Sequence, residues 1–371
     1  MRSVLITGAK GFLGRNLAAH LRARADYKLL LCDLETSADE LNAWLSEADV
    51  VFHLAGVNRP EDPKEFESGN AGFTLSLCEA LLRLRKRPKL ILSSSIQATQ
   101  DNAYGISKRR AEEALLGFRE RTGAEVRIFR LKNVFGKWCR PNYNSVVATF
   151  CYNVAHGLPL SISDPEREVD LVYVDDVVAA FLAEMSPDAA QAEYYVADTI
   201  PSYRIRLGEL AGRIEGFRSM GRNLYTPDFS VRFNQCLYAT YLSYVEAADR
   251  RRGLEVKPDQ RGALAEFLKS PHCGQLFVSL TKPGITRGNH YHHTKAEQFF
   301  VVAGEGLIRM RHIEGVEVIE YRVRGEDFSV VDIPPGYTHS IENTGEGELV
   351  TLFWANQIFD LERPDTYPLD V

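Results

Sequence analysis

Three glycines after a short apolar run near the N-terminus constrain the fold more than any other feature of the chain. Gly8, Gly11 and Gly14 follow the apolar residues 4–6 and lead into the helical pattern of residues 15–22. Glycine permits a tight turn and a close backbone approach to a pyrophosphate, and the free N–H groups at the start of a helix bind such an anion. Because a strand precedes the loop and a helix follows it, the sequence predicts a dinucleotide-binding βαβ unit.

The alternation of apolar runs and helical stretches continues to about residue 180. It is typical of a parallel sheet buried on both faces, and it predicts an α/β domain with a doubly wound sheet of the Rossmann type. Residues 185–245 are mixed and polar-aromatic, and we assign them to the substrate lobe of the same domain. The remaining strands are expected at residues 28–32, 50–53, 90–93 and 126–130.

A charged stretch at residues 246–252 predicts a linker, and the pattern changes beyond it. Short alternating runs without intervening helices indicate an antiparallel sandwich or barrel. A chain of 371 residues also exceeds what one hydrophobic core usually serves. We therefore predict two domains, residues 1–246 and 247–371. Strands of the second domain are expected at residues 275–280, 298–302, 307–312 and 349–354.

Composition excludes several functional classes. The formal charge of −6 argues against a nucleic-acid partner, because affinity for phosphates rests largely on Lys and Arg. The one basic run, residues 83–87, is expected to end a helix before Pro88. Six scattered cysteines without a C-x-x-C pair are typical of reduced thiols. No signal-type segment and no run of about 18 apolar residues is present, so we expect a soluble, cytoplasmic protein without a membrane partner.

Further motifs place the first domain in a known group. Residues 53–56 (HLAG), Tyr104-x-x-x-Lys108, Arg130-x-x-Asn133 and residues 173–176 (YVDD) follow the glycine loop in order. With that loop, they resemble the extended short-chain dehydrogenase/reductase family over residues 1–245. The resemblance implies that Tyr104 exchanges a proton with the reacting oxygen and that Lys108 holds the nicotinamide ribose. It also implies a catalytic serine after the strand, for which Ser95 is the first choice and Ser94 the second.

Elementary chemistry agrees with these roles. A Tyr and a Lys four residues apart share one helix face, and a nearby cation should lower the tyrosine pKa toward neutrality. Dehydratases of the family need an acid and a base directly after the serine, where this chain has Ile96 and Gln97. Neither side chain transfers a proton, so the sequence argues against dehydration.

Two groups of residues compete over the choice of cofactor. Asp33, at the end of the second expected strand, is placed to bind the ribose 2′-hydroxyl of NADH, whereas Lys10 and Arg15 could bind the 2′-phosphate of NADPH. We favour NADPH, and NADH stays open. The predicted cofactor-binding residues are Gly8, Lys10, Gly11, Phe12, Leu13, Gly14, Arg15, Asp33, Leu54, Ala55, Gly56, Tyr104 and Lys108.

The second domain carries a metal-binding pattern. His290-x-His292-x4-Glu297 is followed by Pro334-x-Gly336-x2-His339-x3-Asn343, which matches both halves of the cupin signature. Alternation puts His290 and His292 on one face of a strand, and Glu297 and His339 are expected on adjoining strands that face the barrel interior. Three imidazoles and a carboxylate suit Zn, Fe, Mn or Ni; we favour Zn²⁺ as a redox-silent Lewis acid. Five further histidines are expected to be structural: His20, His53, His156, His272 and His312.

A second resemblance gives His290 an alternative role. Asp259-x-Arg261-Gly262 and Arg287-Gly288-x-His290 are similar to the nucleotide-sugar 3,5-epimerases built on the cupin barrel. In those enzymes the histidine after Arg-Gly removes the proton and no metal is used. We favour the ligand role for His290, which leaves the base open between His293 and Tyr337.

The whole chain resembles one bifunctional family of capsular polysaccharide enzymes in the pathway to UDP-N-acetyl-L-fucosamine, through residues 93–101, 135–139 and 141–145. The resemblance implies C3 epimerisation of a UDP-2-acetamido-2,6-dideoxy-4-hexulose on the cupin, then C4 reduction with NADPH to a UDP-N-acetyl-6-deoxy-L-talosamine. It further implies a homodimer and, by family position, sugar-nucleotide contacts from Asn133 and Asn142. Two alternatives stay open: an NAD-dependent UDP-sugar 4-epimerase with a structural or regulatory cupin, and an iron-dependent cupin oxygenase.

Overall fold

The computed structural model describes residues 1–186, 194–196 and 199–371. The chain forms two compact units, each with its own core. The first comprises residues 1–214 and 235–245, and the second comprises residues 215–234 and 246–371. Residues 215–234, which the sequence assigned to the first domain, thus cluster with the second unit, while the predicted boundary after residue 246 stays a prediction. No helix in the described ranges is long and apolar enough to cross a membrane.

The first unit is built on a five-stranded parallel sheet with the order β2-β1-β3-β4-β5. β1 has β2 on one side and β3 on the other, so the strand order reverses direction at β1 and creates the switch point where α/β proteins bind ligands. All five strands expected from the sequence are present, and the predicted doubly wound α/β fold is confirmed. The strands are β1 (Arg2–Thr7), β2 (Tyr27–Cys32), β3 (Val50–His53), β4 (Lys89–Ser95) and β5 (Val126–Leu131).

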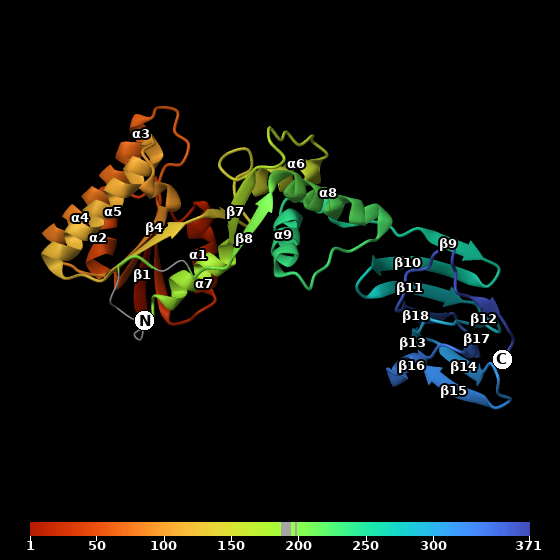
Figure 1. Cartoon of the computed structure of the whole chain (residues 1–371). Helices are drawn as coiled ribbons and strands as arrows, with labels where there is room; N and C mark the ends of the chain where they lie inside the picture. Colours follow the sequence, from red (N-terminus) through yellow and green to blue (C-terminus); the bar gives the residue numbers. More distant parts are fainter. Residues whose placement is uncertain (187–193, 197–198) are drawn as a thin grey trace. The chain divides into compact units, whose positions relative to one another are not determined.

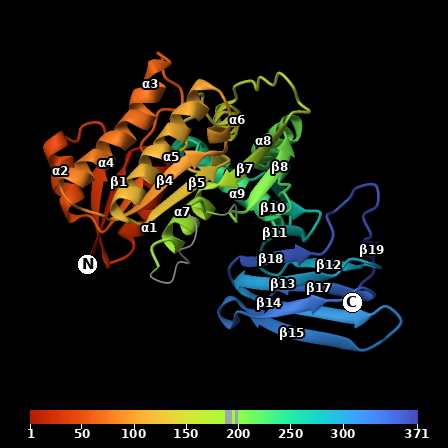
Figure 2. The same cartoon turned by 60° about the vertical axis from the view of Figure 1, so that its left-hand side comes forward.

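Helices cover both faces of this sheet (Figures 1 and 2). α1 (Phe12–Arg22) and α7 (Val174–Ala183) pack on one face through side chains such as Leu17 and Phe181. On the other face of the sheet, three further helices pack through Leu45, Leu81 and Phe118. The strands are buried on both sides, as their near-continuous apolar runs require. These three helices are α2 (Ala38–Glu47), α4 (Phe73–Arg83) and α5 (Ala103–Thr122), and α4 ends at the basic run as predicted.

Smaller elements complete the first unit. A three-stranded sheet has the order β6-β7-β8, with β6 and β7 parallel and β8 antiparallel to β7. A π-helical turn, η1, precedes α4, and a 3₁₀ turn, η2, links β4 to α5. The bounds are β6 (Asn133–Phe135), β7 (Glu168–Tyr173), β8 (Ser202–Arg206), α3 (Lys64–Phe66), η1 (Glu67–Gly72), η2 (Ile96–Thr99), α6 (Val146–His156), α8 (Leu207–Asn223), α9 (Arg232–Leu242) and η3 (Ala247–Arg250), of which α8 and α9 run into the second unit and η3 lies within it.

The second unit contains two antiparallel sheets, and the predicted all-β cupin-like domain is confirmed. Their orders are β16-β13-β18-β11-β10-β9 and β15-β14-β17-β12-β19. The bounds are β9 (Val256–Asp259), β10 (Gly262–Ser270), β11 (Gly274–Thr281), β12 (Thr286–Tyr291), β13 (Glu297–Ala303), β14 (Glu305–His312), β15 (Val318–Arg324), η4 (Gly325–Asp327), β16 (Val330–Ile333), β17 (Tyr337–Asn343), β18 (Leu349–Ala355) and β19 (Tyr367–Pro368).

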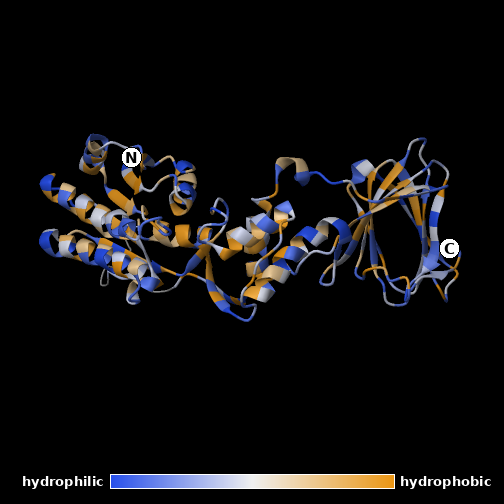
Figure 3. Ribbon diagram, turned by 90° about the horizontal axis from the view of Figure 1, so that it is seen from above, coloured by the Kyte–Doolittle hydropathy of each residue, from blue (hydrophilic) through white to orange (hydrophobic). Residues whose placement is uncertain are grey.

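The core of the second unit lies between its two sheets. Phe299 and Phe353 from one sheet share a buried cluster with Ile308 and Ile341 from the other. Burial alternates along β18, because successive side chains point to opposite faces, and Figure 3 shows both hydrophobic and hydrophilic residues on the strands of this unit. At one end of the strands, the polar residues of the predicted metal site occupy inward-facing positions.

Candidate active sites

The glycine loop has the geometry that dinucleotide binding requires. Gly8 has a φ of +67°, and a Cβ there would lie 2.8 Å from the backbone of Ala55, in the loop that follows β3. A Cβ on Gly14 would lie 2.2 Å from the carbonyl oxygen of Gly8, so only glycine lets α1 pack this closely against the loop. α1 begins at Phe12 without any side-chain cap, which leaves its first N–H groups available to a pyrophosphate.

The residues expected to select the cofactor already have partners. The carboxylate of Asp33 accepts a 2.6 Å hydrogen bond from the backbone N–H of Lys10. The Lys10 ammonium lies 2.8 Å from Glu35, with both side chains largely exposed. The Arg15 guanidinium lies 5.0 Å from the ring centroid of Trp138. Lys10 of the glycine loop therefore lies beside Asp33 at the end of β2. Glu35 adds a second carboxylate here, which we did not single out from the sequence.

Ser95, Tyr104 and Lys108 come together because β4 and α5 are joined by a very short connection. A Cβ on Gly105 would lie 2.2 Å from the carbonyl oxygen of Gln97, so the start of α5 packs tightly against η2. Asn102 caps this helix by accepting a 2.7 Å bond from the N–H of Gly105. The close packing accounts for the short interval between the serine and the tyrosine.

The pKa values of this group follow from burial. Burial raises the pKa of Tyr104, and a hydrogen bond with Ser95 partly offsets the rise. The expected lowering of this pKa by Lys108 does not occur in these surroundings, because the Lys108 ammonium instead donates a 2.9 Å bond to the carbonyl of Ser93. Burial lowers the pKa of Lys108 to about 8, although the nearby Glu112 opposes the shift. Ser95 rather than Ser94 is thus the serine beside the tyrosine.

Glu112 is a buried carboxylate that the sequence reasoning missed. It lies one helical turn beyond Lys108 and is 1% exposed. It accepts hydrogen bonds from the Ser94 hydroxyl (2.5 Å), the Arg130 guanidinium (2.6 Å) and the Tyr195 hydroxyl (2.9 Å). This cluster fixes the face of α5 that carries Tyr104 and Lys108. No local signal marks Glu112, since its partners are distant in sequence.

A second network supports the loop after β3. His53 bonds the Thr7 hydroxyl through Nδ1 (2.8 Å) and the Thr74 hydroxyl through Nε2 (2.9 Å), which confirms its structural role. Asn70 accepts a 2.9 Å bond from the N–H of Val57 and donates a 2.9 Å bond to the Ser107 hydroxyl on α5. Sequence reasoning missed Asn70, which lies in the π-helical turn η1, a geometry frequent at functional sites.

The two predicted sugar-nucleotide residues are exposed. The Asn133 side chain donates a 3.1 Å bond to the carbonyl of Asp170. Asn142 has a φ of +54° and donates its backbone N–H to Thr149. Tyr143, the next residue along the chain, lies close enough to Tyr104 to raise its pKa. Tyr143 is thus a further candidate substrate contact that we did not single out from the sequence.

In the second unit, the four predicted metal ligands converge. Their ligand atoms all lie within 4.8 Å of one another. His290 on β12 pairs directly with His339 on β17, and their ring centroids are 4.7 Å apart. Glu297 begins β13, which belongs to the opposite sheet. The expectation of adjoining strands is therefore correct for His339 but wrong for Glu297, whose carboxylate faces the histidines across the barrel interior.

The hydrogen bonds of this cluster leave lone pairs facing a carboxylate. The Nδ1 atoms of His292 and His339 bond the backbone carbonyls of Asp365 and Tyr337, which assigns their protons to Nδ1. Both Nε2 atoms are buried without a hydrogen-bond partner, and they lie 3.5 and 3.3 Å from oxygens of Glu297. A divalent cation would satisfy these three groups at once, so the donor set fits a metal ion.

Charges in the cluster are also those of metal ligands. Burial, followed by His339 and His292, lowers the pKa of His290 to about 4, so its ring is neutral. Burial opposes ionisation of Glu297, but His292 and His339 outweigh it and hold its pKa below the usual range. A neutral imidazole at His290 and an ionised carboxylate at Glu297 are the forms in which these groups bind a metal ion.

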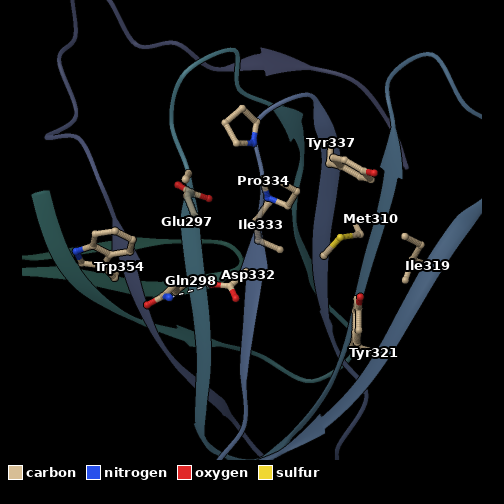
Figure 4. Close-up of a pocket in the computed structure, with 12 residues that line it drawn as sticks. Glu297, Gln298, Met310, Ile319, Tyr321, Asp332, Ile333, Pro334, Tyr337 and Trp354 are labelled. Atoms are coloured by element: carbon tan, nitrogen blue, oxygen red, sulfur yellow. Dashed lines mark hydrogen bonds between the residues drawn. The ribbon is translucent and has the colours of Figure 1, made fainter.

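A cavity of about 460 Å³ opens beside Glu297 (Figure 4). Tyr337 also lines it. His293 is exposed instead, and its ring packs 4.8 Å from that of Tyr367. Of the two candidate bases, Tyr337 therefore lines the cavity that also reaches Glu297, whereas His293 is not among its lining residues. The other lining residues include Met310, Ile319, Tyr321, Ile333 and Trp354.

Comparison with known proteins gives a family match for each of the two units. Residues 4–197 match the NAD dependent epimerase/dehydratase family, and residues 257–367 match the polysaccharide biosynthesis C-terminal domain. A UDP-2-acetamido-2,6-beta-L-arabino-hexul-4-ose reductase of Pseudomonas aeruginosa is 43% identical over 99% of this chain and 98% of its own. The chain belongs to this reductase family of capsular polysaccharide synthesis.

Solved structures extend this result to the whole fold. The capsular polysaccharide assembling protein CapF from Staphylococcus aureus has 45% sequence identity and a TM-score of 0.92, covering 99% of this chain and all of its own. A CapF structure with the inhibitor 3-isopropenyl-tropolone has 40% identity and a TM-score of 0.87 over the full length of both chains. Membership of the family makes the first unit an oxidoreductase that uses a nicotinamide dinucleotide.

Proposed function

We propose that this chain carries out two successive reactions on one UDP-linked 4-keto-6-deoxy-N-acetylhexosamine. The second unit epimerises C3 of a UDP-2-acetamido-2,6-dideoxy-4-hexulose, and the first unit reduces C4 with NADPH to give UDP-N-acetyl-6-deoxy-L-talosamine. One observation carries the proposal: a Ser95–Tyr104–Lys108 group at a glycine loop and a separate His₃Glu cluster lie on one chain, each with its own core. The Pseudomonas relative, named for reduction of a 4-keto hexulose, supports the substrate class.

In the reductase unit, the reduced nicotinamide supplies a hydride to C4. Tyr104 donates its phenolic proton to the oxygen of the same carbonyl, and Ser95, which bonds Tyr104, orients that oxygen. Lys108 is placed to hold the cofactor ribose, since it lies on the same face of α5 one turn from Tyr104. Ile96 and Gln97 follow the serine, so the site has no acid and base pair for dehydration.

In the cupin-like unit, His290, His292, Glu297 and His339 would hold a Zn²⁺ ion. Such an ion supplies Lewis-acid stabilisation to the negative charge that builds on the C4 oxygen when the C3 proton leaves. Tyr337 lines the adjoining cavity and is our candidate for the proton-transfer group. A C3 proton is removable only while C4 is a ketone, because the charge must delocalise onto the carbonyl oxygen. Epimerisation therefore precedes reduction.

Deuterium incorporation at C3 tests the proposal directly. The full-length chain, loaded with Zn²⁺, is incubated with the UDP-4-keto sugar in D₂O without cofactor, and C3 is followed by NMR. Wild type and Tyr104→Phe should exchange the C3 proton at similar rates, whereas Glu297→Gln should exchange about 100-fold more slowly. With NADPH added, wild type should reduce the epimerised sugar, whereas Tyr104→Phe should accumulate it without reduction. Exchange that depends on Tyr104, or no exchange at all, would remove the epimerase assignment.

We also propose a homodimer, as the resemblance implies. Exposed apolar side chains at two edge strands of the second unit support it: Phe328, just before β16, is 80% exposed and Val330 on β16 is 53% exposed, and Val318 and Tyr321 on β15 are 42% and 41% exposed. Exposed apolar surface marks interaction sites when it is extensive. Light scattering should give twice the chain mass, and a Phe328→Glu/Val330→Lys double variant should give one; a monomeric wild type contradicts the proposal.

A further inference from the structure

The segment Pro364–Asp370 lies against the metal cluster, although none of its residues belongs to the ligand set. Its strand β19 pairs with β12, so that Pro368 lies opposite His290. The carbonyl of Asp365 accepts the Nδ1 proton of His292. The Thr338 hydroxyl, next to His339, donates to the carbonyl of Leu369. This segment thus contacts the backbone of His290, the ring of His292 and, through Thr338, the residue next to His339.

Asp365 is the centre of these contacts. Its carboxylate accepts hydrogen bonds from three successive backbone N–H groups, those of His293 (3.0 Å), Thr294 (2.9 Å) and Lys295 (3.0 Å). It also accepts the Thr294 hydroxyl at 2.9 Å. The loop between His292 and Glu297 is therefore held by one side chain, and the same residue's carbonyl holds the ring of His292.

The backbone at Asp365 is unusual in a way that fits this role. Its φ is +42°, in the left-handed region that Asp tolerates better than most residues. This turn presents the carbonyl and the carboxylate to the same loop. The preceding Pro364 is fixed as well, because its carbonyl accepts the Lys295 ammonium at 3.0 Å. Strained residues kept in place by several contacts occur at functional sites.

From this geometry we propose that Pro364–Asp370 is a strap that sets the tautomer and orientation of the His292 imidazole and holds the strands that carry His290 and His339, with Asp365 as the positioning residue. The inference rests on the proposed metal centre. Outer partners of this kind fix which nitrogen binds the metal, and losing one typically weakens metal binding about 10-fold to 100-fold. The strap contributes no ligand atom, so it acts through the backbone of His290, the ring of His292, Thr338 and the 293–295 loop.

Metal affinity of the full-length chain tests the strap. Zn²⁺ binding is measured by competition with a chromophoric chelator for wild type, Asp365→Ala, Asp365→Asn and Asp360→Ala. Asp365→Ala should bind Zn²⁺ about 10-fold to 100-fold more weakly. Asp365→Asn keeps an oxygen for Thr294 and Lys295 but turns a donor toward His293, so its affinity should be intermediate. Asp360→Ala is the matched control, because that carboxylate makes only local contacts with residues 362 and 363.

A spectroscopic measurement separates positioning from general loss of structure. At saturating Co²⁺, the visible absorption bands of Asp365→Ala should shift from those of wild type, and Asp365→Asn should partly restore them. Thermal unfolding of each variant, followed by circular dichroism, shows whether the second unit is folded. If Asp365→Ala binds Zn²⁺ as wild type does while His339→Ala does not, the strap is overturned and the metal centre stands. If wild type binds no metal that depends on His339, the metal centre itself fails.

Discussion

At the scale of one residue, the burial of Lys108 that its proposed role requires lowers the stability of the folded protein. Its ammonium is buried among Ser93, Gly56 and the Glu112 cluster, and its pKa is about 8. Between pH 8 and the ordinary value of 10.5, the unfolded chain binds a proton that the folded chain has released. Stability should therefore rise with pH across this window, and below it the buried charge is a constant cost.

Lys108→Met removes this titration. The difference in unfolding free energy, wild type minus variant, should be constant below pH 8 and should increase by about 3 kcal/mol toward pH 10.5. Denaturant unfolding of both proteins at pH 7, 8, 9 and 10 measures it, and all other groups cancel in the difference. A constant difference over the whole range would show that Lys108 keeps an ordinary pKa.

Cofactor choice is also decided at single residues. In the proposed complex with NADPH, Lys10 binds the 2′-phosphate, and its exposed pair with Glu35 contributes so little that the side chain can turn to the cofactor. Lys10→Met should lower kcat/KM for NADPH about tenfold and leave that for NADH nearly unchanged. Glu35→Gln is the converse variant, and it should raise kcat/KM for NADPH because it removes a nearby anion. An equal loss with both cofactors for Lys10→Met would instead place Lys10 on the pyrophosphate.

Among the elements, α5 depends on a single close approach. Gly105 lets the helix meet η2, and a Cβ there would lie 2.2 Å from the carbonyl of Gln97. Gly105→Ala should push α5 away from Ser95, lowering kcat for reduction by about 10-fold to 100-fold and destabilising the unit. Gly117→Ala on the same helix is the control: nothing lies within 4 Å of its Cβ, so it should stabilise the protein by about 0.5–1 kcal/mol. Steady-state kinetics and thermal unfolding distinguish them.

The elements also show what a sequence can predict. The five parallel strands were predictable because burial on both faces demands continuous apolar runs, and the convergence of the three histidines and Glu297 because their spacing matches the cupin signature. Glu112, Asn70 and Asp365 were not, since each is a polar residue whose partners lie elsewhere in the chain. Such residues have no periodicity, and only the fold brings their partners to them.

For the whole molecule, the two cores imply two separable activities. Removal of the metal with a strong chelator should abolish C3 deuterium exchange but leave NADPH-dependent reduction of the C3-epimerised 4-keto sugar nearly intact. Adding Zn²⁺ should restore exchange. The assay follows exchange by NMR and NADPH by absorbance in the same sample. Loss of both activities on chelation would mean that the metal supports the fold of the chain rather than one reaction.

Strand pairing in the second unit has a consequence for how the protein is made. β11 pairs with β18, and β12 with β19, so Gln275 meets Ala355 and Tyr291 meets Tyr367. Contacts between such distant residues form slowly, because closing a long loop costs conformational entropy before any stabilising hydrogen bond has formed. The parallel sheet, synthesised first, can fold while these strands still lack partners. The candidate metal ligands are then brought together late, and the proposed ion would enter a finished barrel rather than nucleate one.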